Sequence, residues 1–192
     1  MGASAFRSAL QRALRAALFV LLLTAAKGDS TKKRPAVILG RVLSYELTLE
    51  DRMGEAVGIA VVYRRDDPAS EANADEWLEG LLELSSMKIK DRRVFALKVP
   101  FSTSEMSAAV DKGADVLLVS DGLSSELPSI AQFARSKHVL TMGNTVSYVE
   151  KDLTLCVTEE GDKSRIFINL NVAHLEGIRF GSRLLALATL IR

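Results

Sequence analysis

The stretch Asp115–Gly122, which reads DVLLVSDG, decides the fold that this chain can adopt. It holds four consecutive apolar residues and closes with Ser120, Asp121 and Gly122, which favour a turn. A short apolar run that ends in turn formers is typical of a strand covered on both faces. Similar runs occupy Val57–Tyr63, Val94–Pro100 and Val139–Gly143. Because segments of helical period separate these runs, the sequence predicts strands and helices that alternate around a parallel sheet.

The pattern changes in the last fifth of the chain. Residues 153–158 alternate between apolar and polar side chains, and residues 166–170 again show a period of two. Two such runs around a Gly-containing turn predict an antiparallel hairpin at the sheet edge. Apolar residues then recur at helical spacing, at Leu184, Leu187, Ala188 and Ile191. The predicted fold class is α/β: an open, mostly parallel sheet with helices on both faces, an antiparallel edge hairpin and a C-terminal helix.

The amino terminus has the three parts of a secretory signal peptide. A basic start with three arginines precedes the apolar core Ala16–Leu23, and the small residues Thr24–Ala26 follow. Since the apolar core is much shorter than the roughly 20 residues that span a bilayer, cleavage is favoured over a membrane anchor. We therefore expect a periplasmic protein without membrane insertion after cleavage. The expected organisation is a signal peptide at 1–26, a loose lead-in at 27–34 and a single domain at 35–192.

Charge and cysteine content exclude several classes of partner and site. Cleavage after Ala26 would remove three arginines and no acid, so the net charge of +1 would become about −2. A mildly acidic, evenly mixed domain gives no electrostatic reason to expect nucleic acid or anionic lipid as a partner. Cys156 is the single cysteine, so no internal disulfide forms. Its apolar neighbours indicate a small buried hydrophobe.

Signatures of catalysis and of metal or cofactor binding are absent from the sequence. It contains no CxxC, HExxH, GxSxG, Walker A or GxGxxG pattern. His138 follows a predicted helix and reads as a capping or surface group. His174 and Glu176 are two residues apart, so they point in different directions on a helix. We therefore expect no enzyme, no cofactor and no metal site.

A receiver domain of a response regulator is one alternative. The acids Asp66, Asp67 and Asp121 follow predicted strands, and Thr145 follows the next one. However, no Lys-Pro pair closes a fifth strand, and export would separate the chain from a cytoplasmic kinase. Turn and cap roles for these acids are therefore favoured over phosphorylation.

A ligand crevice is the second alternative. In open parallel sheets, ligands bind beyond the carboxyl ends of the strands, where the strand order reverses. With the strand order 2-1-3-4, that edge carries Tyr63, Arg64, Phe101, Ser120, Asp121, Gly122 and Asn144. These residues suit a small polar ligand, and they equally suit ordinary loop positions.

The carboxyl-terminal segment Arg165–Ile191 reads RIFINLNVAHLEGIRFGSRLLALATLI. It resembles the closing signature of the YfiR family of exported bacterial proteins, which has an Ile-Asn-Leu strand, an Ala/Gly segment and then Ser-x-Leu-Leu-x-Leu-Ala. The matching residues are Ile168, Asn169, Leu170, Ala173, Gly177, Ser182, Leu184, Leu185, Leu187 and Ala188. Taken as structure, Asn169 would satisfy backbone groups where a strand gives way to a helix, and Gly177 would permit the following break. A structural role is therefore favoured for this motif.

The resemblance implies a periplasmic regulatory protein and not an enzyme. The best-known members of the YfiR family resemble inhibitors of membrane-bound diguanylate cyclases, which lower cyclic-di-GMP output, and others accompany sensor kinases or outer-membrane receptors. The implied partner is an inner-membrane signalling protein, and a homodimer is the expected assembly. Such inhibitors carry cysteine pairs that form disulfides, whereas Cys156 is alone, so redox control is not expected.

Overall fold

The computed structural model describes residues 32–161 and 163–192. The predicted signal peptide and most of the predicted lead-in lie outside the described residues. The first described helix, α2, spans Lys33–Ser44 and begins two residues before Pro35. Proline suits this first turn because the N–H groups there have no helical partners.

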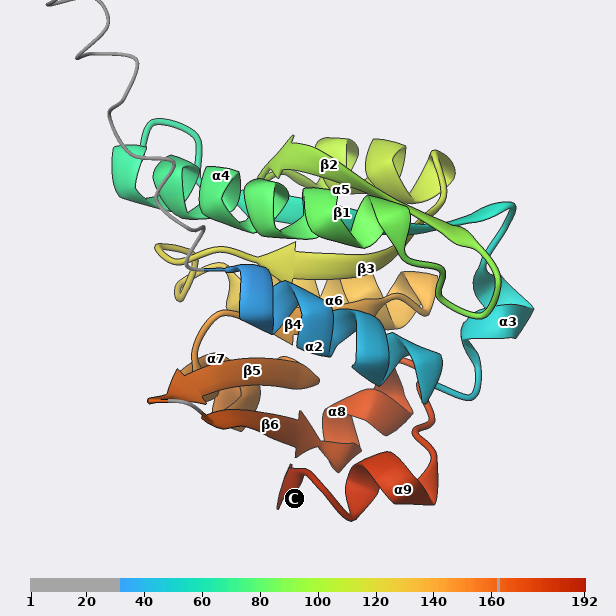
Figure 1. Cartoon of the computed structure of the whole chain (residues 1–192). Helices are drawn as coiled ribbons and strands as arrows, with labels where there is room; N and C mark the ends of the chain where they lie inside the picture. Colours follow the sequence, from blue (N-terminus) through green and yellow to red (C-terminus); the bar gives the residue numbers. More distant parts are fainter. Residues whose placement is uncertain (1–31, 162) are drawn as a thin grey trace, which may run out of the picture. The chain divides into compact units, whose positions relative to one another are not determined.

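The described strands form one mixed sheet in the order β2-β1-β3-β4-β5-β6-β7 (Figure 1). β5 and β6 are antiparallel, and all other neighbours in the sheet are parallel. The strands span Ala56–Tyr63 (β1), Arg93–Pro100 (β2), Ala114–Val119 (β3), Leu140–Gly143 (β4), Leu155–Glu160 (β5), Lys163–Asn169 (β6) and Thr189–Ile191 (β7). The predicted α/β class and the strand order 2-1-3-4 are therefore confirmed.

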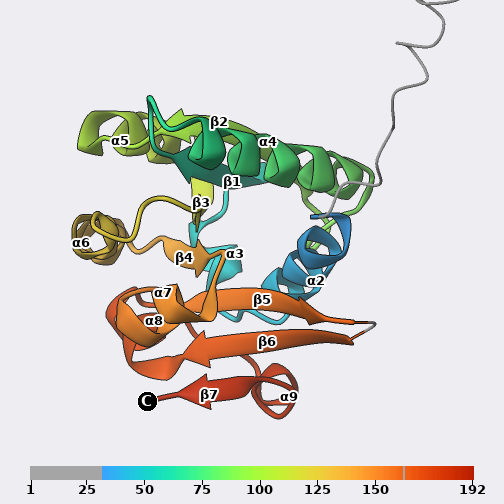
Figure 2. The same cartoon turned by 90° about the vertical axis from the view of Figure 1, so that its left-hand side faces the viewer.

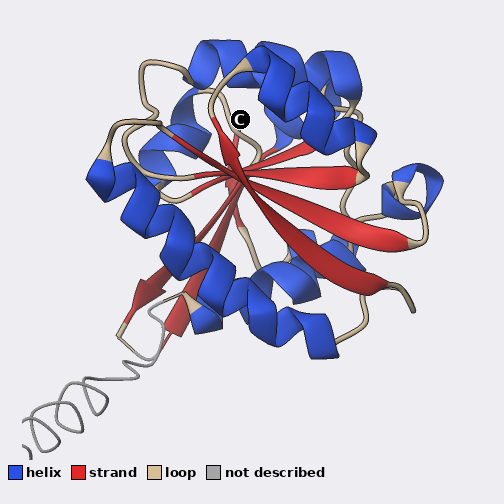
Figure 3. Ribbon diagram, turned by 90° about the horizontal axis from the view of Figure 1, so that it is seen from above, coloured by secondary structure: helices blue, strands red, loops and turns tan. Residues whose placement is uncertain are grey.

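Helices cover both faces of the sheet (Figures 2 and 3). α2 and α4 pack on one face, and α5 and α6 pack on the other. The remaining helices of the described chain are short. Besides α2, the helices span Leu49–Arg52 (α3), Pro68–Leu82 (α4), Glu83–Ser86 (η1, a 3₁₀ helix), Thr103–Asp111 (α5), Leu127–Lys137 (α6), Val146–Lys151 (α7), Leu170–Leu175 (α8) and Ser182–Leu185 (α9).

The apolar run of Asp115–Gly122 forms β3, near the centre of the sheet. All six residues of β3 are buried, including Asp115. Val116 and Leu118 contact the core under α2 and α4, while Leu117 and Val119 contact the core under α5 and α6. This two-sided burial explains why the strand reads as a continuous apolar run instead of an alternating one.

Two predictions about the end of the chain are wrong in detail. The C-terminal helix spans only Ser182–Leu185, and the chain then forms β7, which pairs with Phe167–Asn169 of β6. The antiparallel hairpin therefore lies one strand inside the edge, because β7 takes the outer position. β6 provides hydrogen-bond partners for the backbone of Thr189–Ile191. These bonds to a strand distant in sequence favour an extended conformation, although the leucines have helical spacing. Leu187, which was expected on the inner face of a helix, is 78% exposed.

Side chains near the starts of α4, α5 and α6 show how these helices begin. α4 begins at Pro68, where the Asp67 carboxylate accepts the N–H groups of Ala69 and Ser70. Ser125 does not cap α6, which has Glu126 at its N-cap position without a side-chain bond. By contrast, a side chain caps α5, since Ser102 Oγ accepts the Glu105 N–H at 3.1 Å.

Candidate functional site

The residues predicted to line a crevice lie at the carboxyl-terminal edge of the parallel strands. The strand order reverses between β1 and β3, so the loops after these two strands flank the position where ligands bind in open parallel sheets. Arg64 begins the first loop and Ser120 begins the second. The structure thus places the predicted residues at one edge, but their side chains bond mainly to other protein groups.

Arg64 joins the two loops across the reversal point. Its Nε donates to the Gly122 carbonyl at 2.8 Å, and its Nη2 donates to Ser125 Oγ and pairs with the Glu126 carboxylate. Gly122 has a φ of +85°, and a Cβ there would lie 2.7 Å from Asp67 Oδ2, so glycine is required. The guanidinium therefore serves to hold the loops together.

Asn144 is the centre of a second polar group at this edge. Its Nδ2 donates to Asp121 Oδ2 at 2.8 Å, and its Oδ1 accepts from Trp77 Nε1 at 3.1 Å and from Lys32 Nζ at 3.0 Å. The Lys32 ammonium also lies 5.3 Å from the Trp77 ring centroid. Asn73 Oδ1 accepts the Asp121 N–H. The sequence predicted Asp121 and Asn144 at this edge, but not Lys32 or Asn73. Trp77 is a fully buried core residue whose indole N–H reaches this polar group.

The other predicted crevice residues are less closely joined. Phe101 donates its backbone N–H to the Tyr63 carbonyl at 2.7 Å, which continues the β1–β2 ladder. The Tyr63 ring lies 4.9 Å from the Lys98 ammonium. Ser120 is fully buried, and its Oγ has no hydrogen-bond partner among the described residues. A buried hydroxyl without a protein partner is unusual, and a bound ligand or an ordered water satisfies such a group.

Cys156 lies on β5 and is fully buried. Burial raises the pKa of its thiol to about 12, so the thiol stays protonated at neutral pH. The prediction of a small buried hydrophobe is confirmed.

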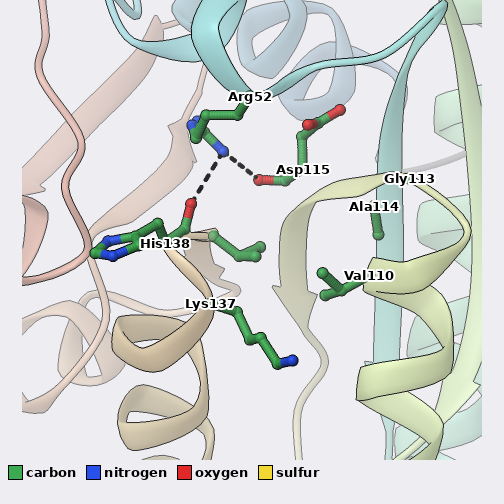
Figure 4. A pocket seen from close by; sticks show the side chains of 8 residues that line it. Arg52, Val110, Gly113, Ala114, Asp115, Lys137 and His138 are labelled. Carbon is green, nitrogen blue, oxygen red and sulfur yellow. Dashed lines mark hydrogen bonds between the residues drawn. The ribbon is translucent and has the colours of Figure 1, made fainter.

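A cavity of about 160 Å³ opens at the opposite, amino-terminal edge of the sheet (Figure 4). It lies where β3 and β4 begin and where α5 and α6 end. We call it the amino-edge cavity. Its lining residues are Arg52, Val110, Gly113, Ala114, Asp115, Lys137, His138 and Val139. Sequence reasoning did not predict it.

Arg52 of α3 forms one wall of the amino-edge cavity. Its Nη1 donates to the backbone carbonyls of Asp115 and His138, at 3.1 and 3.4 Å. Its Nη2 pairs with Glu46 Oε2 at 2.6 Å, and Glu46 is fully buried and also accepts the backbone N–H and the hydroxyl of Thr48. The Arg52 Nε is buried and has no partner within the described part of the chain. Three contacts from two of its nitrogens therefore fix the guanidinium, while the Nε–H donor is left unused.

Asp115 shows how the backbone shapes this edge. The register between β1 and β3 jumps from the pair Gly58–Ala114 to the pair Ile59–Val116, so Asp115 is the extra residue of a β-bulge. Its Oδ2 accepts the Gly58 N–H at 3.0 Å, and its carboxylate points away from the cavity (Figure 4). Burial raises the pKa of Asp115, against the opposing effects of the Gly58 hydrogen bond and the Arg52 charge. A charged residue that opens a buried strand was the sequence signal for this arrangement.

Glu176 is a second buried carboxylate that sequence reasoning did not place. It follows α8 and accepts the Thr141 N–H at 3.0 Å, the Thr141 hydroxyl at 2.5 Å and the Thr154 hydroxyl at 2.7 Å. Burial raises the pKa of Glu176 to about 7, although these three hydrogen bonds and the charge of Arg135 act in the other direction. Glu176 therefore joins the carboxyl-terminal segment to β4 and to the residue before β5.

The carboxyl-terminal motif residues make contacts of a structural kind. Asn169 caps α8 by accepting the Val172 N–H at 3.1 Å, and its Nδ2 donates to the Val149 carbonyl at 2.9 Å. Gly177 has a φ of +76°, and a Cβ there would lie 3.0 Å from His138 Nδ1. Ser182 begins α9. The apolar members pack in or against the core under α2 and α4: Ile168, Leu170, Ala173, Leu184 and Leu185.

Comparison with known proteins identifies the family. The sequence profile of the YfiR/HmsC-like family matches residues 72–189, which include the carboxyl-terminal motif and most of the sheet. The chain belongs to the YfiR/HmsC-like family. No curated protein matches this member of the family. The resemblance noted in the sequence is thus confirmed.

Solved structures share the fold of this YfiR/HmsC-like protein. They include a conserved domain protein from Vibrio cholerae (TM-score 0.58, 14% identity, 84% of this chain and 60% of that one). They also include the substrate-binding protein CD0873 from Clostridium difficile in its ligand-free, open form (TM-score 0.54, 17% identity, 76% of this chain and 57% of that one). A third is the ABC domain in complex with L-Trp from Streptococcus pneumoniae (TM-score 0.51, 15% identity, 79% of this chain and 60% of that one). The chain spans about three fifths of each of these chains, and identities this low show the fold alone.

Two further properties concern the described part of this YfiR/HmsC-like chain. Among residues 32–161 and 163–192, no helix has the length and apolar character needed to span a membrane. Within the same ranges, no three His, Cys, Asp or Glu side chains gather in a way that could hold a metal ion.

Proposed function

We propose that this protein is a non-catalytic periplasmic regulator that binds an inner-membrane signalling protein and tunes its output. The observation that carries the proposal is the family match over residues 72–189. Membership of the YfiR/HmsC-like family supports a periplasmic regulatory role. The first partner class to test is a membrane-bound diguanylate cyclase with a periplasmic sensor region, which this protein would repress.

The test compares two forms of the chain in cells that contain such a cyclase. The full chain carries the predicted signal peptide, and a matched form that begins at Lys27 lacks it. If the proposal is right, the full chain lowers intracellular cyclic-di-GMP and co-purifies with the detergent-solubilised cyclase, while the leaderless form does neither. Equal cyclic-di-GMP levels with both forms, together with no enrichment of a cyclase, sensor kinase or receptor, would overturn the proposal.

A second candidate function is binding of a small solute at the carboxyl-terminal edge. Two observations support it: the buried Ser120 hydroxyl lacks a partner among the described residues, and solved structures that share the fold include a complex with L-Trp and a substrate-binding protein. In this interpretation the solute replaces some of the bonds around Asp121 and Asn144.

Trp77 gives a direct measurement for this second function. It is the single tryptophan of the chain, and its indole N–H bonds to Asn144. A bound solute should change its fluorescence and raise the melting temperature, and Asp121→Ala should remove both effects. A panel of amino acids, sugars and nucleotides that leaves both measurements unchanged would rule this function out.

A further inference from the structure

We propose that β2 is the surface through which two copies of this chain associate, with their β2 strands antiparallel in one continuous sheet. The regulatory role proposed above does not specify this surface, and the inference holds whichever partner the protein regulates. Three features carry it: the unpaired backbone of β2, an apolar side-chain pattern that matches its own reverse, and opposite charges beside α5 at matching distances from the centre of the strand.

The backbone of β2 is open on one side. β2 is the outer strand at one end of the described sheet, and all eight of its residues pair with β1 (Figures 1 and 2). Phe101 donates its N–H to the Tyr63 carbonyl of β1. Because main-chain groups alternate in direction along a strand, those of Val94, Ala96 and Lys98 point away from β1. An unpaired edge of this length is a template for another strand.

Lysine and proline commonly protect edge strands, but neither blocks this one. Lys98 pairs with Glu71 and Asp75 of its own α4, and its ammonium lies 4.9 Å from the Tyr63 ring centroid. Its charge is therefore held against α4 and β1 of the same chain. Pro100 lacks an N–H, but it is the last residue of the strand, so the central backbone groups stay available.

The side chains of β2 form an apolar pattern that is similar in both directions from Leu97. Leu97 and Val99 pack on the core under α5 and α6, and Phe95 shares their face because side chains alternate along a strand. In an antiparallel pair centred on Leu97, this residue faces its own copy, and Phe95 faces Val99 of the second copy. Apolar cross-strand pairs stabilise a sheet. The same register places Ala96 opposite Lys98 of the second copy, so that their outward main-chain groups can bond.

Charges beside α5 favour a second copy over an arbitrary strand. Glu105 of α5 and Lys112, which directly follows the helix, are exposed and line one hollow together with Ala108 and residues 97–99 of β2. The middle of α5 therefore lies level with the centre of the proposed pairing. A two-fold axis through Leu97 reverses the second α5, so that Glu105 lies opposite Lys112 of the other copy, and the equivalent pair forms across the axis. Complementary charges of this kind fix partner and register.

Analytical ultracentrifugation of the chain from Lys27 onward, over a dilution series, measures the association. We expect a reversible equilibrium between monomer and dimer. Hydrogen exchange should show that the amides of Ala96 and Lys98 are protected in the dimer and exchange faster on dilution. A chain that stays monomeric would overturn the proposal and leave the edge of β2 to an extended strand of another protein. A dimer in which these two amides exchange as in the monomer would also overturn it.

Charge reversal tests the proposed pairing directly. Glu105→Lys and Lys112→Glu should each weaken the dimer about tenfold, because each variant brings like charges together at two symmetric positions. The double variant restores opposite charges and should dimerise nearly as the wild type does. The matched control Glu150→Lys reverses an exposed charge on α7, which packs against β4, β5 and β6, and should leave the equilibrium unchanged. If the double variant dimerises no better than the single variants, the pairing is wrong.

Ala96→Pro tests the backbone contribution independently of charge. Proline removes the outward N–H of this residue and leaves the hydrogen bonds between β2 and β1 in place, so the variant should fold and remain monomeric. Circular dichroism and thermal unfolding check the fold, and ultracentrifugation checks the assembly. A folded Ala96→Pro variant that dimerises as tightly as the wild type would show that β2 is not the interface.

Discussion

Glu176 Oε2 accepts a hydrogen bond from the Thr154 hydroxyl at 2.7 Å, and both residues are completely buried. The same carboxylate binds the N–H and the hydroxyl of Thr141 on β4. The Thr141 hydroxyl in turn accepts the Thr154 N–H at 2.9 Å. This closed set of bonds fixes the segment after α8 against the sheet without a direct ion pair, so its strength depends on the charge state of one buried carboxyl group.

Stability should therefore depend on pH through Glu176. Burial raises its pKa from an ordinary 4.5 to about 7, which means that the folded state binds this proton more tightly than the unfolded state. This group consequently lowers the free energy of unfolding as the pH rises from about 4.5 to about 7. The total change is on the order of 3 kcal/mol.

Urea denaturation of the wild type and of Glu176→Gln across this pH range isolates the contribution. The free energy of unfolding of the wild type, minus that of Glu176→Gln, should fall as the pH rises from about 4.5 to about 7, because the amide does not titrate. Glu150→Gln, on an exposed position of α7, is the control and should follow the wild-type curve. Parallel curves for the wild type and Glu176→Gln would refute the prediction.

Asn169→Ala should destabilise the protein by about 2–4 kcal/mol. The variant loses the cap of α8, typically worth about 1 kcal/mol, and leaves the buried Val149 carbonyl without a donor, which costs about 1–3 kcal/mol. Chemical denaturation measures this loss. Asn171, two residues further along the chain, is exposed, so Asn171→Ala should change stability by less than about 0.5 kcal/mol. Similar losses for the two asparagines would argue against the capping role.

Gly177→Ala should cost about 1–2 kcal/mol for the strained backbone at positive φ, and more where the new Cβ meets His138 Nδ1. A double-mutant cycle separates the two causes. His138→Asn shortens the facing side chain and tolerates the positive φ at that position, so Gly177→Ala should cost less in this background. An identical cost in both backgrounds would mean that the contact with His138 contributes nothing.

Gly58→Ala tests the tight approach of β1 and β3 at the bulge. A Cβ at Gly58 would lie 2.2 Å from the Gly113 carbonyl oxygen and 2.8 Å from Ala114 Cα, both of which are backbone atoms. The strands must separate to admit it, so we expect a loss of about 3 kcal/mol or more in urea denaturation. Gly54→Ala, which meets nothing within 4 Å, should be nearly neutral. A neutral Gly58→Ala would show that this part of the sheet adapts easily.

The sequence allowed the sheet centre to be predicted but not the chain end. β1 and β3 are buried on both faces, so their composition alone marks them as strands. The spacing of Leu184 and Leu187 suggested a helix, and only the partner strand β6 explains why residues 189–191 are extended. The local sequence pattern contains no information about hydrogen bonds to a strand that is distant in sequence.

The candidate sites show the same limit. Asp121 and Asn144 were correctly placed at strand ends, but their mutual bond depends on side-chain geometry. The amino-edge cavity combines α3, the bulge at Asp115 and the end of α6, and no single segment contains its pattern. The charge of Asp115 at the start of a buried strand was the available signal, because a buried charge requires a partner.

The central place of β1 affects how the protein can be shortened. The family profile starts at residue 72, yet β1 ends at Tyr63 and lies between β2 and β3. A fragment trimmed to the profile would leave β2 with no neighbour in the sheet and would expose an apolar strand edge that invites aggregation. Expression boundaries for this family are therefore best set from the strand order, upstream of α2, and not from the limits of sequence similarity.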